Sequence, residues 1–275
     1  MIVDSHLHVW SADLERYPVA EGREPREAAP VELLNEHMAA AGVDQAVIVQ
    51  AIGYMHDNRY VADCLRRFPG RFAGTGLIDH KAPDAPDVLE KLVREDGFAG
   101  LRIHLASRVD HPSLWATPDQ DPLWRRAEEV GANITLYGPA AHLEVVEPIV
   151  ARFPGVRIVL DHVGGVPRPD DDDHDRLRDY VVGLSRYEQI HVKFTPQAHR
   201  SQEPFPYPDT FDLYRRLFDA YGPQRVMWGT NFPGVLSSTG YAPALELFQR
   251  HLDFLTDDDR RWLLGETARE VFGLR

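Results

Sequence analysis

The chain has 275 residues, 43% hydrophobic and 27% charged, so it is long enough to bury a sizeable core. Its 30 basic and 43 acidic residues give a formal net charge of −13, which argues against nucleic acid or an anionic membrane as the partner. The single cysteine, Cys64, excludes an internal disulfide, and neither a signal-peptide pattern nor a membrane-spanning apolar run is evident, so we expect a cytoplasmic protein.

Short β-branched segments alternate along the chain with segments of helical spacing. The predicted strands cover residues 2–8, 45–50, 72–78, 99–104, 133–137, 157–162, 189–194 and 225–229. The predicted helices lie near 31–41, 57–68, 84–95, 121–131, 142–152, 174–186, 209–221 and 241–251. Most of the strands are nearly all apolar, as in a parallel sheet that is buried on both faces.

Eight strand–helix units predict an α/β protein built as one (β/α)8 TIM barrel, with a single domain over residues 1–275. A doubly wound sheet is the structural alternative. It is disfavoured because no G-x-G-x-x-G motif follows the first strand, and because eight units exceed the usual number for that fold. Segments 11–30 and 196–209 follow the first and seventh strands, so they should lie at the catalytic end of the barrel.

Polar residues gather at the predicted C-terminal ends of the strands, where barrel enzymes place their catalytic groups. On the first strand, His6 and His8 are two residues apart and should share one face with Asp4. The other strand ends supply Gln50, Asp79, His80, Arg102, His104, Tyr137, Asp161, His162, Lys193, Thr195 and Asn231. Two incidental histidines at an exposed strand end would also explain the first motif. They would not explain the whole set.

Two basic residues among these strand ends have two interpretations each. Arg102 and Lys193 would bind a carboxylate of the substrate, Arg102 through its planar guanidinium. Alternatively, each forms an internal salt bridge with Asp79 or Asp161, because a buried cation needs a partner.

Four segments carry a resemblance to a known family. They are Asp-Ser-His-Leu-His-Val-Trp at 4–10, Leu-Asp-His-Val-Gly-Gly at 160–165, Met-Trp-Gly-Thr-Asn-Phe-Pro at 227–233 and Gly-Glu-Thr-Ala-Arg-Glu-Val-Phe-Gly at 265–273. Together they resemble the amidohydrolase-2 family, and more narrowly its lactonase branch, which includes sugar-lactone and 2-pyrone-4,6-dicarboxylate lactonases. The resemblance runs from end to end of the chain and implies an amidohydrolase-type barrel.

The resemblance also implies a site. His6, His8 and His162 match the family's histidines on strands 1 and 6. They would hold one divalent metal, zinc by preference, or act without metal as hydrogen-bond donors to an oxyanion. Asn231 stands where the family has an aspartate, and an amide accepts no proton near neutral pH. Strand 5 ends in Tyr137 rather than a bridging lysine or histidine, which argues against a binuclear centre.

The function predicted from these residues is a hydrolase that opens a lactone or related cyclic ester of a small, carboxylated metabolite. The predicted catalytic residues are His6, His8, His162 and Asn231, and the predicted substrate-binding residues are Gln50, Arg102, His104, Tyr137 and Lys193. A metal-dependent decarboxylase of a small unsaturated or aromatic acid is the first alternative. A non-catalytic ligand-binding barrel is the second.

Asn231 leaves three explanations open. It is an engineered change, a natural change in an enzyme whose base is another residue such as His104 or His162, or a sign that hydrolysis has been lost. The partner we expect is a small-molecule substrate. The sequence does not decide whether the protein forms a homodimer. The loops that would select the substrate are 11–30, 53–58, 105–120, 196–209 and 234–240.

Overall fold

Eight parallel strands form the centre of the protein in a computed structural model that describes residues 1–25, 28–105 and 115–275. The strands are β1 (Val3–Leu7), β2 (Gln45–Val49), β3 (Phe72–Gly76), β4 (Phe98–His104), β5 (Asn133–Tyr137), β6 (Ile158–Leu160), β7 (Ile190–Phe194) and β8 (Val226–Trp228). Each lies within two residues of a predicted strand. Neighbours in the sequence are neighbours in the sheet, from β1 to β8.

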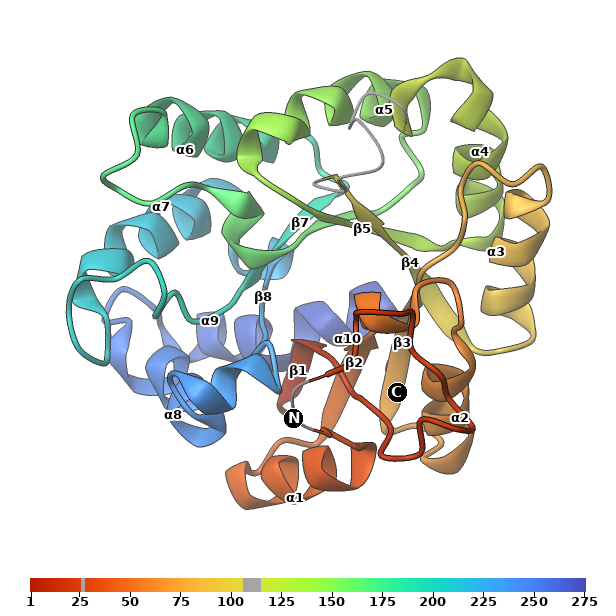
Figure 1. Cartoon of the computed structure of the whole chain (residues 1–275). Helices are drawn as coiled ribbons and strands as arrows, with labels where there is room; N and C mark the ends of the chain where they lie inside the picture. The colour runs from red at the N-terminus through yellow and green to blue at the C-terminus, as the bar shows by residue number, and fades with distance from the viewer. Residues whose placement is uncertain (26–27, 106–114) are drawn as a thin grey trace.

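The sheet closes into a barrel between β1 and the residues that follow β8 (Figure 1). The N–H of His8 donates to the carbonyl of Phe232 at 2.7 Å, and the N–H of Asn231 donates to the carbonyl of His6 at 2.7 Å. A side chain at Gly229 would place its Cβ 2.7 Å from the Cβ of His6, so this close approach requires glycine. The predicted (β/α)8 barrel is therefore confirmed.

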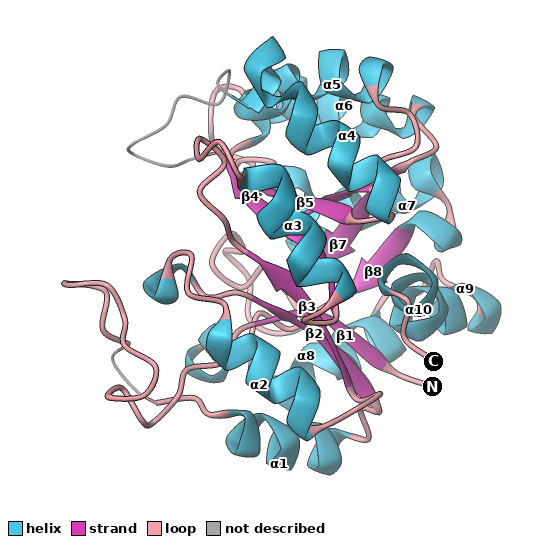
Figure 2. Ribbon diagram, turned by 90° about the vertical axis from the view of Figure 1, so that its right-hand side faces the viewer, coloured by secondary structure: helices cyan, strands magenta, loops and turns pink. Residues whose placement is uncertain are grey.

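Helices surround the barrel (Figures 1 and 2). They are α1 (Val31–Ala41), α2 (Arg59–Arg67), α3 (Ala85–Arg94), α4 (Asp121–Val130), α5 (Val146–Arg152), α6 (His174–Gly183), α7 (Phe211–Tyr221), α8 (Tyr241–Glu246), α9 (Asp257–Arg261) and α10 (Thr267–Phe272). Two predicted helices are irregular: one begins with 3₁₀ turns over Ala140–Val145, and one continues as a π-helix over Leu247–His251.

Helix α9 was not predicted from the sequence, because its residues Asp-Asp-Asp-Arg-Arg have no apolar spacing. A signal was nevertheless present. The Thr256 hydroxyl accepts from the N–H of Asp259, and the Asp259 carboxylate accepts from the N–H of Thr256, which makes a capping box.

The second unpredicted helix, α10, closes the barrel at the amino-terminal ends of the strands. Its Val271 and Phe272 pack with Val3 and other buried strand residues in a small cluster. The carbonyl of Val271 accepts a 2.6 Å hydrogen bond from Asn133, the first residue of β5. The predicted site residues lie at the opposite end of the barrel, where the strands end.

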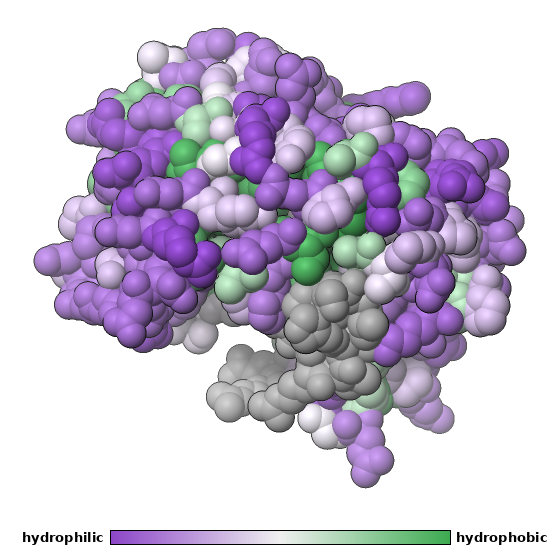
Figure 3. Space-filling view, turned by 90° about the horizontal axis from the view of Figure 1, so that it is seen from above, coloured by the Kyte–Doolittle hydropathy of each residue, from purple (hydrophilic) through white to green (hydrophobic). Residues whose placement is uncertain are grey.

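The outside of the protein is largely polar. In the face that Figure 3 shows, hydrophilic residues cover most of the surface around a smaller group of hydrophobic ones. Among the described residues, no helix combines the length and apolar character needed to cross a membrane.

Candidate active site

All nine predicted site residues lie at or near the carboxyl ends of the strands. Three of them are histidines whose rings come together, from β1, from the turn after β1 and from the turn after β6. The ring centroid of His6 lies 5.1 Å from that of His8 and 4.5 Å from that of His162. The structure thus gathers the predicted catalytic histidines at the end of the barrel where such enzymes have their active sites.

Asp161, which follows β6, joins these histidines to the predicted basic residues. Its carboxylate lies 3.1 Å from Nδ1 of His6, 2.8 Å from Nε of Arg102 and 3.2 Å from Nζ of Lys193. The side chains of Asp161, Lys193 and His6 are fully buried, and that of Arg102 is 5% exposed. Both basic residues therefore have the internal salt bridge to Asp161 that the sequence left open as an alternative.

The charges of this cluster do not cancel. Burial alone would raise the pKa of Asp161, but His6, Lys193 and Arg102 beside it hold that pKa well below its ordinary value. Burial lowers the pKa of Lys193, and the attraction of Asp161 opposes that effect. One carboxylate faces two cations, so the site is locally positive within an acidic protein. A positive site favours an anion, or an oxygen on which negative charge develops.

The histidines of the site are neutral at physiological pH. Burial lowers the pKa of His8 to about 4, and burial lowers the pKa values of His104 and His162 to about 3 each. The pKa of His6 is also held well below its ordinary value, first by burial. Each ring therefore offers one N–H and one nitrogen lone pair, and the hydrogen bonds decide which nitrogen is which.

A hydrogen bond fixes the tautomer of His8, and the ion pair with Asp161 favours the same tautomer for His6. Nδ1 of His8 lies 2.8 Å from the carbonyl oxygen of Val49, which only accepts, so this nitrogen carries the proton. Nδ1 of His6 lies 3.1 Å from a carboxylate oxygen of the ionised Asp161, which only accepts, and 3.4 Å from Nζ of Lys193, which only donates. The shorter contact favours a proton on Nδ1. In both rings Nε2 keeps its lone pair. Nε2 of His6 is buried and has no hydrogen-bond partner in the described part of the chain. It is therefore available to accept a proton from a bound molecule.

Two predicted substrate-binding residues differ in how accessible they are. Tyr137 is 37% exposed, and its ring lies 4.4 Å from the Arg102 guanidinium and 5.6 Å from the ring of His162. Tyr137 thus forms a wall of the site beside His104, whose ring centroid is 5.2 Å away. Gln50 is fully buried, and its amide donates to the carbonyl of Asp57 at 2.7 Å, which ties the loop after β2 to its strand.

Asp4 does not join the histidines. Its carboxylate accepts from the N–H and hydroxyl of Thr230, at 2.9 and 2.6 Å, and from the hydroxyl of Tyr241 in α8 at 3.1 Å. The pairing of β1 with β2 shifts register between Asp4 and Leu7, so the simple two-residue alternation does not hold along this strand. Asp4 instead fastens β1 to the turn that carries Asn231.

His162 and Asn231 both have backbones in the left-handed region, with φ of 49° and 65°. Asparagine accepts this conformation at little cost, whereas histidine and the following Val163, with φ of 52°, accept it less readily. Such strain concentrates at functional sites, because the surrounding structure must hold it. Here it turns the two side chains toward one pocket.

That pocket has a volume of about 260 Å³ and lies between the turns that follow β6, β7 and β8. Residues of its lining with side chains that can form hydrogen bonds are His162, Thr195, His199, Thr230, Asn231, Ser237 and Ser238. Hydroxyl, amide and imidazole groups dominate, and no lysine or arginine is among its lining residues in the described chain. The pocket therefore suits an uncharged polar molecule beside the positive cluster.

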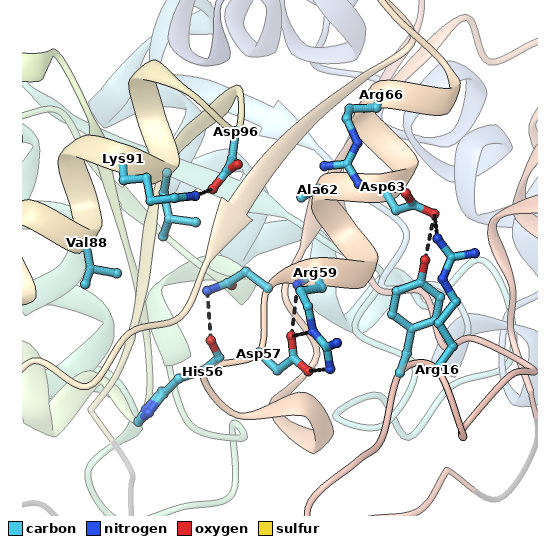
Figure 4. Close-up of a pocket in the computed structure, with 13 residues that line it drawn as sticks. Arg16, His56, Asp57, Arg59, Ala62, Asp63, Arg66, Val88, Lys91 and Asp96 are labelled. Carbon is cyan, nitrogen blue, oxygen red and sulfur yellow. Dashed lines mark hydrogen bonds and ion pairs between the residues drawn. The ribbon is translucent and has the colours of Figure 1, made fainter.

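A larger cavity, of about 460 Å³, lies between α2, α3 and the segment around Arg16 (Figure 4). Its basic side chains already have carboxylate partners: Arg59 pairs with Asp57 and Lys91 pairs with Asp96, both at 2.6 Å. None of the predicted site residues lines it. The smaller pocket, which has the predicted residues His162 and Asn231 in its wall, is therefore the better candidate for the active site.

Because the histidine pKa values are lowered in the folded protein, we expect the free energy of unfolding to decrease as the pH falls below about 6.5. A group with a depressed folded pKa stabilises the folded state above its unfolded pKa, near 6.5 for histidine, and this contribution is lost as the pH falls toward the folded value. Each such histidine contributes about 1.4 kcal/mol per pH unit in that window. Asp4 acts oppositely, because burial raises its pKa to about 6, so its contribution is lost as the pH rises toward 6.

We expect His104→Gln to remove the contribution of one histidine to the pH dependence of the free energy of unfolding. Between pH 6 and pH 4.5, the free energy of unfolding should then fall less steeply than in the unsubstituted protein, by about 1.4 kcal/mol per pH unit. Urea denaturation at several pH values measures both slopes. Equal slopes in the two proteins would show that His104 binds its proton equally well in the folded and unfolded chains.

The fold and site define a barrel enzyme with a histidine-rich centre, and the comparisons with known proteins give its family. The family model described as Amidohydrolase matches residues 3–274, so the chain belongs to the amidohydrolase family. Among curated proteins, it is 27% identical to an L-fucono-1,5-lactonase of Burkholderia ambifaria, over 84% of this chain and 80% of that one. It is 26% identical to a 2-pyrone-4,6-dicarboxylate hydrolase of Comamonas testosteroni, over 84% and 76%.

Solved structures agree with this assignment. A structure described as a 2-pyrone-4,6-dicarboxylic acid hydrolase from Pseudomonas putida has a TM-score of 0.85 and 26% identity, covering 100% of this chain and 98% of that one. An amidohydrolase from Burkholderia multivorans with bound zinc has a TM-score of 0.83 at 22% identity, with complete coverage of both chains, and shows the fold alone. The predicted family resemblance and the predicted enzyme class, a hydrolase, are confirmed.

The residues of this chain do not fit the zinc ion that the resemblance implies. Within residues 1–25, 28–105 and 115–275, no three His, Cys, Asp or Glu side chains are arranged to hold a metal. Nζ of Lys193 lies 3.4 Å from Nδ1 of His6, so a cation already adjoins the first histidine. Position 231, where the resemblance implies an aspartate, has the neutral amide of Asn231. These side chains are therefore better suited to a hydrolysis in which His6 and its neighbours act without a metal ion.

Proposed function

We propose that this protein hydrolyses a lactone of a small hydroxylated metabolite. The observation that supports it best is the pairing of His6 with Asp161, which leaves a buried, unpartnered Nε2 lone pair on a ring that adjoins the ring of His162. A base of this kind can replace the aspartate that the chain lacks at position 231. The similarity to curated lactone hydrolases supports the same reaction class.

The reaction begins when a water molecule adds its oxygen to the lactone carbonyl carbon and gives a proton to Nε2 of His6. Asp161 stabilises the imidazolium that forms, as the buried carboxylate does in other histidine–carboxylate pairs. The positive charge of Arg102 and Lys193 stabilises the negative charge that develops on the carbonyl oxygen. The tetrahedral intermediate then breaks its ring C–O bond, and the ring oxygen takes the proton from His6. The product is a hydroxy acid.

The pocket favours a substrate with hydroxyl groups. Ser237, Ser238 and His199 offer donors and acceptors to such groups, whereas Arg102 and Lys193 are already paired with Asp161. A substrate with two carboxylates would need further basic groups to balance its charge. We therefore expect a sugar-acid lactone to be preferred over a pyrone dicarboxylate.

The predicted loop segment 105–120 lies mostly outside the described residues, which do not include 106–114.

The test is a panel of aldonolactones and 2-pyrone-4,6-dicarboxylate, assayed by acid release before and after dialysis against a chelator. We expect hydrolysis of at least one aldonolactone, with no dependence on the chelator or on added zinc. His6→Asn should lower kcat by about 10²-fold or more, the usual contribution of a positioned base. His251→Asn, in the outer segment Leu247–His251, is the matched histidine control and should leave kcat unchanged.

Three outcomes would contradict the proposal. Release of CO₂ from an unsaturated or aromatic acid, without lactone hydrolysis, would indicate a decarboxylase. Saturable lactone binding without turnover would indicate a binding protein. Loss of activity on chelation, restored by zinc, would show that the predicted metal is required and that the metal-free mechanism is wrong.

A further inference from the structure

Two residues outside the predicted site lie directly behind His162. Thr195 follows β7 and is 2% exposed, and Gln197 is 1% exposed. The hydroxyl of Thr195 lies 3.0 Å from Nδ1 of His162. The amide nitrogen of Gln197 donates to the Thr195 carbonyl at 2.7 Å and to its hydroxyl oxygen at 3.1 Å. The three side chains form one hydrogen-bonded chain.

The direction of this chain follows from the chemistry of its members. The orientation of the Gln197 amide is set by the Thr195 carbonyl, which only accepts, so the nitrogen of the amide faces Thr195. The Thr195 hydroxyl oxygen accepts from that nitrogen, and its own proton points to Nδ1 of His162. Among the described residues, the reverse arrangement would leave the buried hydroxyl proton without an acceptor, at a cost of about 1–3 kcal/mol. Nδ1 of His162 is therefore the acceptor, and Nε2 carries the proton.

This tautomer is the opposite of the one that His6 and His8 adopt. The ring centroids of His162 and His6 lie 4.5 Å apart, so a ring whose Nε2 donates adjoins a ring whose Nε2 accepts. Hydrolysis of a carbonyl compound needs this combination, an acceptor for the proton of water and a donor for the carbonyl oxygen. The left-handed backbone at His162 holds the ring against Thr195.

We infer that Gln197 and Thr195 are positioning residues that set the tautomer of His162, so that its Nε2–H donates to the carbonyl oxygen of the substrate. The inference rests on the proposed function for the identity of the bound group, but the tautomer itself does not depend on it. Removal of one oxyanion donor typically costs about 10²–10³ in kcat, which bounds the effect of disturbing that donor.

The test reads the tautomer directly, by ¹⁵N NMR of histidine-labelled protein at pH 7. In the unsubstituted protein, His162 should show a proton on Nε2 and none on Nδ1. Thr195→Val removes the hydroxyl at nearly constant volume and should give a mixture of tautomers or the Nδ1–H form. Thr195→Ser should restore the original spectrum. Gln197→Leu frees the Thr195 hydroxyl to accept, and should shift the ring toward the Nδ1–H form.

The matched control is Thr135→Val on β5, a buried threonine whose hydroxyl has no hydrogen-bond partner in the described chain. It should leave the His162 spectrum unchanged. A proton on Nδ1 in the unsubstituted protein, or an unchanged tautomer in both Thr195→Val and Gln197→Leu, would overturn the inference.

Kinetics supply the second readout once a lactone substrate is known. Thr195→Val should lower kcat about 10-fold to 100-fold with little change in KM, because the donor acts on charge that develops in the transition state. Thr195→Ser should recover most of this loss. A changed spectrum with no hydrolysis by any variant would refute the proposed function and keep the tautomer assignment, so the two failures are distinguishable.

Discussion

Replacing Asp161 with asparagine should lower the free energy of unfolding by about 3–5 kcal/mol, the usual effect of removing one member of a buried ion pair. Lys193 is fully buried and Arg102 is 5% exposed, so neither cation can turn to water when its carboxylate partner is lost. The same change deprives His6 of its acceptor at Nδ1 and should lower kcat on any lactone substrate. Urea denaturation with a fluorescence readout measures the stability, and the lactone assay measures kcat.

Two further variants separate the buried charges from the general effect of losing a carboxylate. Asp212→Asn removes an exposed partner of Arg216 at 2.6 Å and should change the unfolding free energy by no more than about 1 kcal/mol. Adding Lys193→Met to Asp161→Asn removes one unpaired cation and should recover part of the lost stability. A loss below about 1 kcal/mol in Asp161→Asn would mean that the buried ion pairs do not form.

The barrel could be predicted because most strands are short apolar segments rich in β-branched residues, and several of the helices between them end in clear stop signals. Gly42 and Gly131, which end α1 and α4 in the left-handed conformation, are examples. α10 could not be predicted in the same way. Its six residues are too few to show an apolar period, and its place under the barrel depends on contacts with Val3 and Met227 from opposite ends of the chain.

The site was predictable as a set of residue types and not as a set of pairs. Strand ends identify His6, Arg102 and Lys193, because charged residues in apolar strands are conspicuous. Their common partner, Asp161, was only one of two candidates in the sequence, since pairing depends on how strands close in space. The tautomer of His162 was invisible, because it is set by side chains from the loop after a different strand.

Asp4 is a residue whose neighbours in the structure differ from those that strand alternation predicts. Simple alternation along β1 predicts that it lies with His6, yet the register shift in that strand sends it to Thr230 and Tyr241. Sequence periodicity assumes a regular strand, and irregular strands are common where a barrel closes. The direction of a side chain next to such an irregularity therefore cannot be predicted from the sequence period alone.

Asn231→Asp should raise kcat for lactone hydrolysis by about 10²–10⁴-fold, the contribution typical of a positioned acid or base. The backbone at this position has φ of 65°, which aspartate accepts as asparagine does, so the turn should keep its shape. The new carboxylate would line the pocket beside His162 and near a locally positive cluster, which favours its ionised form. It would add a proton acceptor to a site whose present one, His6, has a pKa held well below its ordinary value.

The size of the increase tells which residue takes the proton. Asn231→Ala removes the amide without adding a base, so it should leave kcat within a few-fold of the unsubstituted enzyme if His6 is the acceptor. In the doubly substituted protein with His6→Asn and Asn231→Asp, activity should return above that of His6→Asn alone, because the carboxylate then acts in place of the imidazole. An unchanged rate in Asn231→Asp, measured with the same lactone, would remove position 231 from proton transfer and leave His6 as the acceptor.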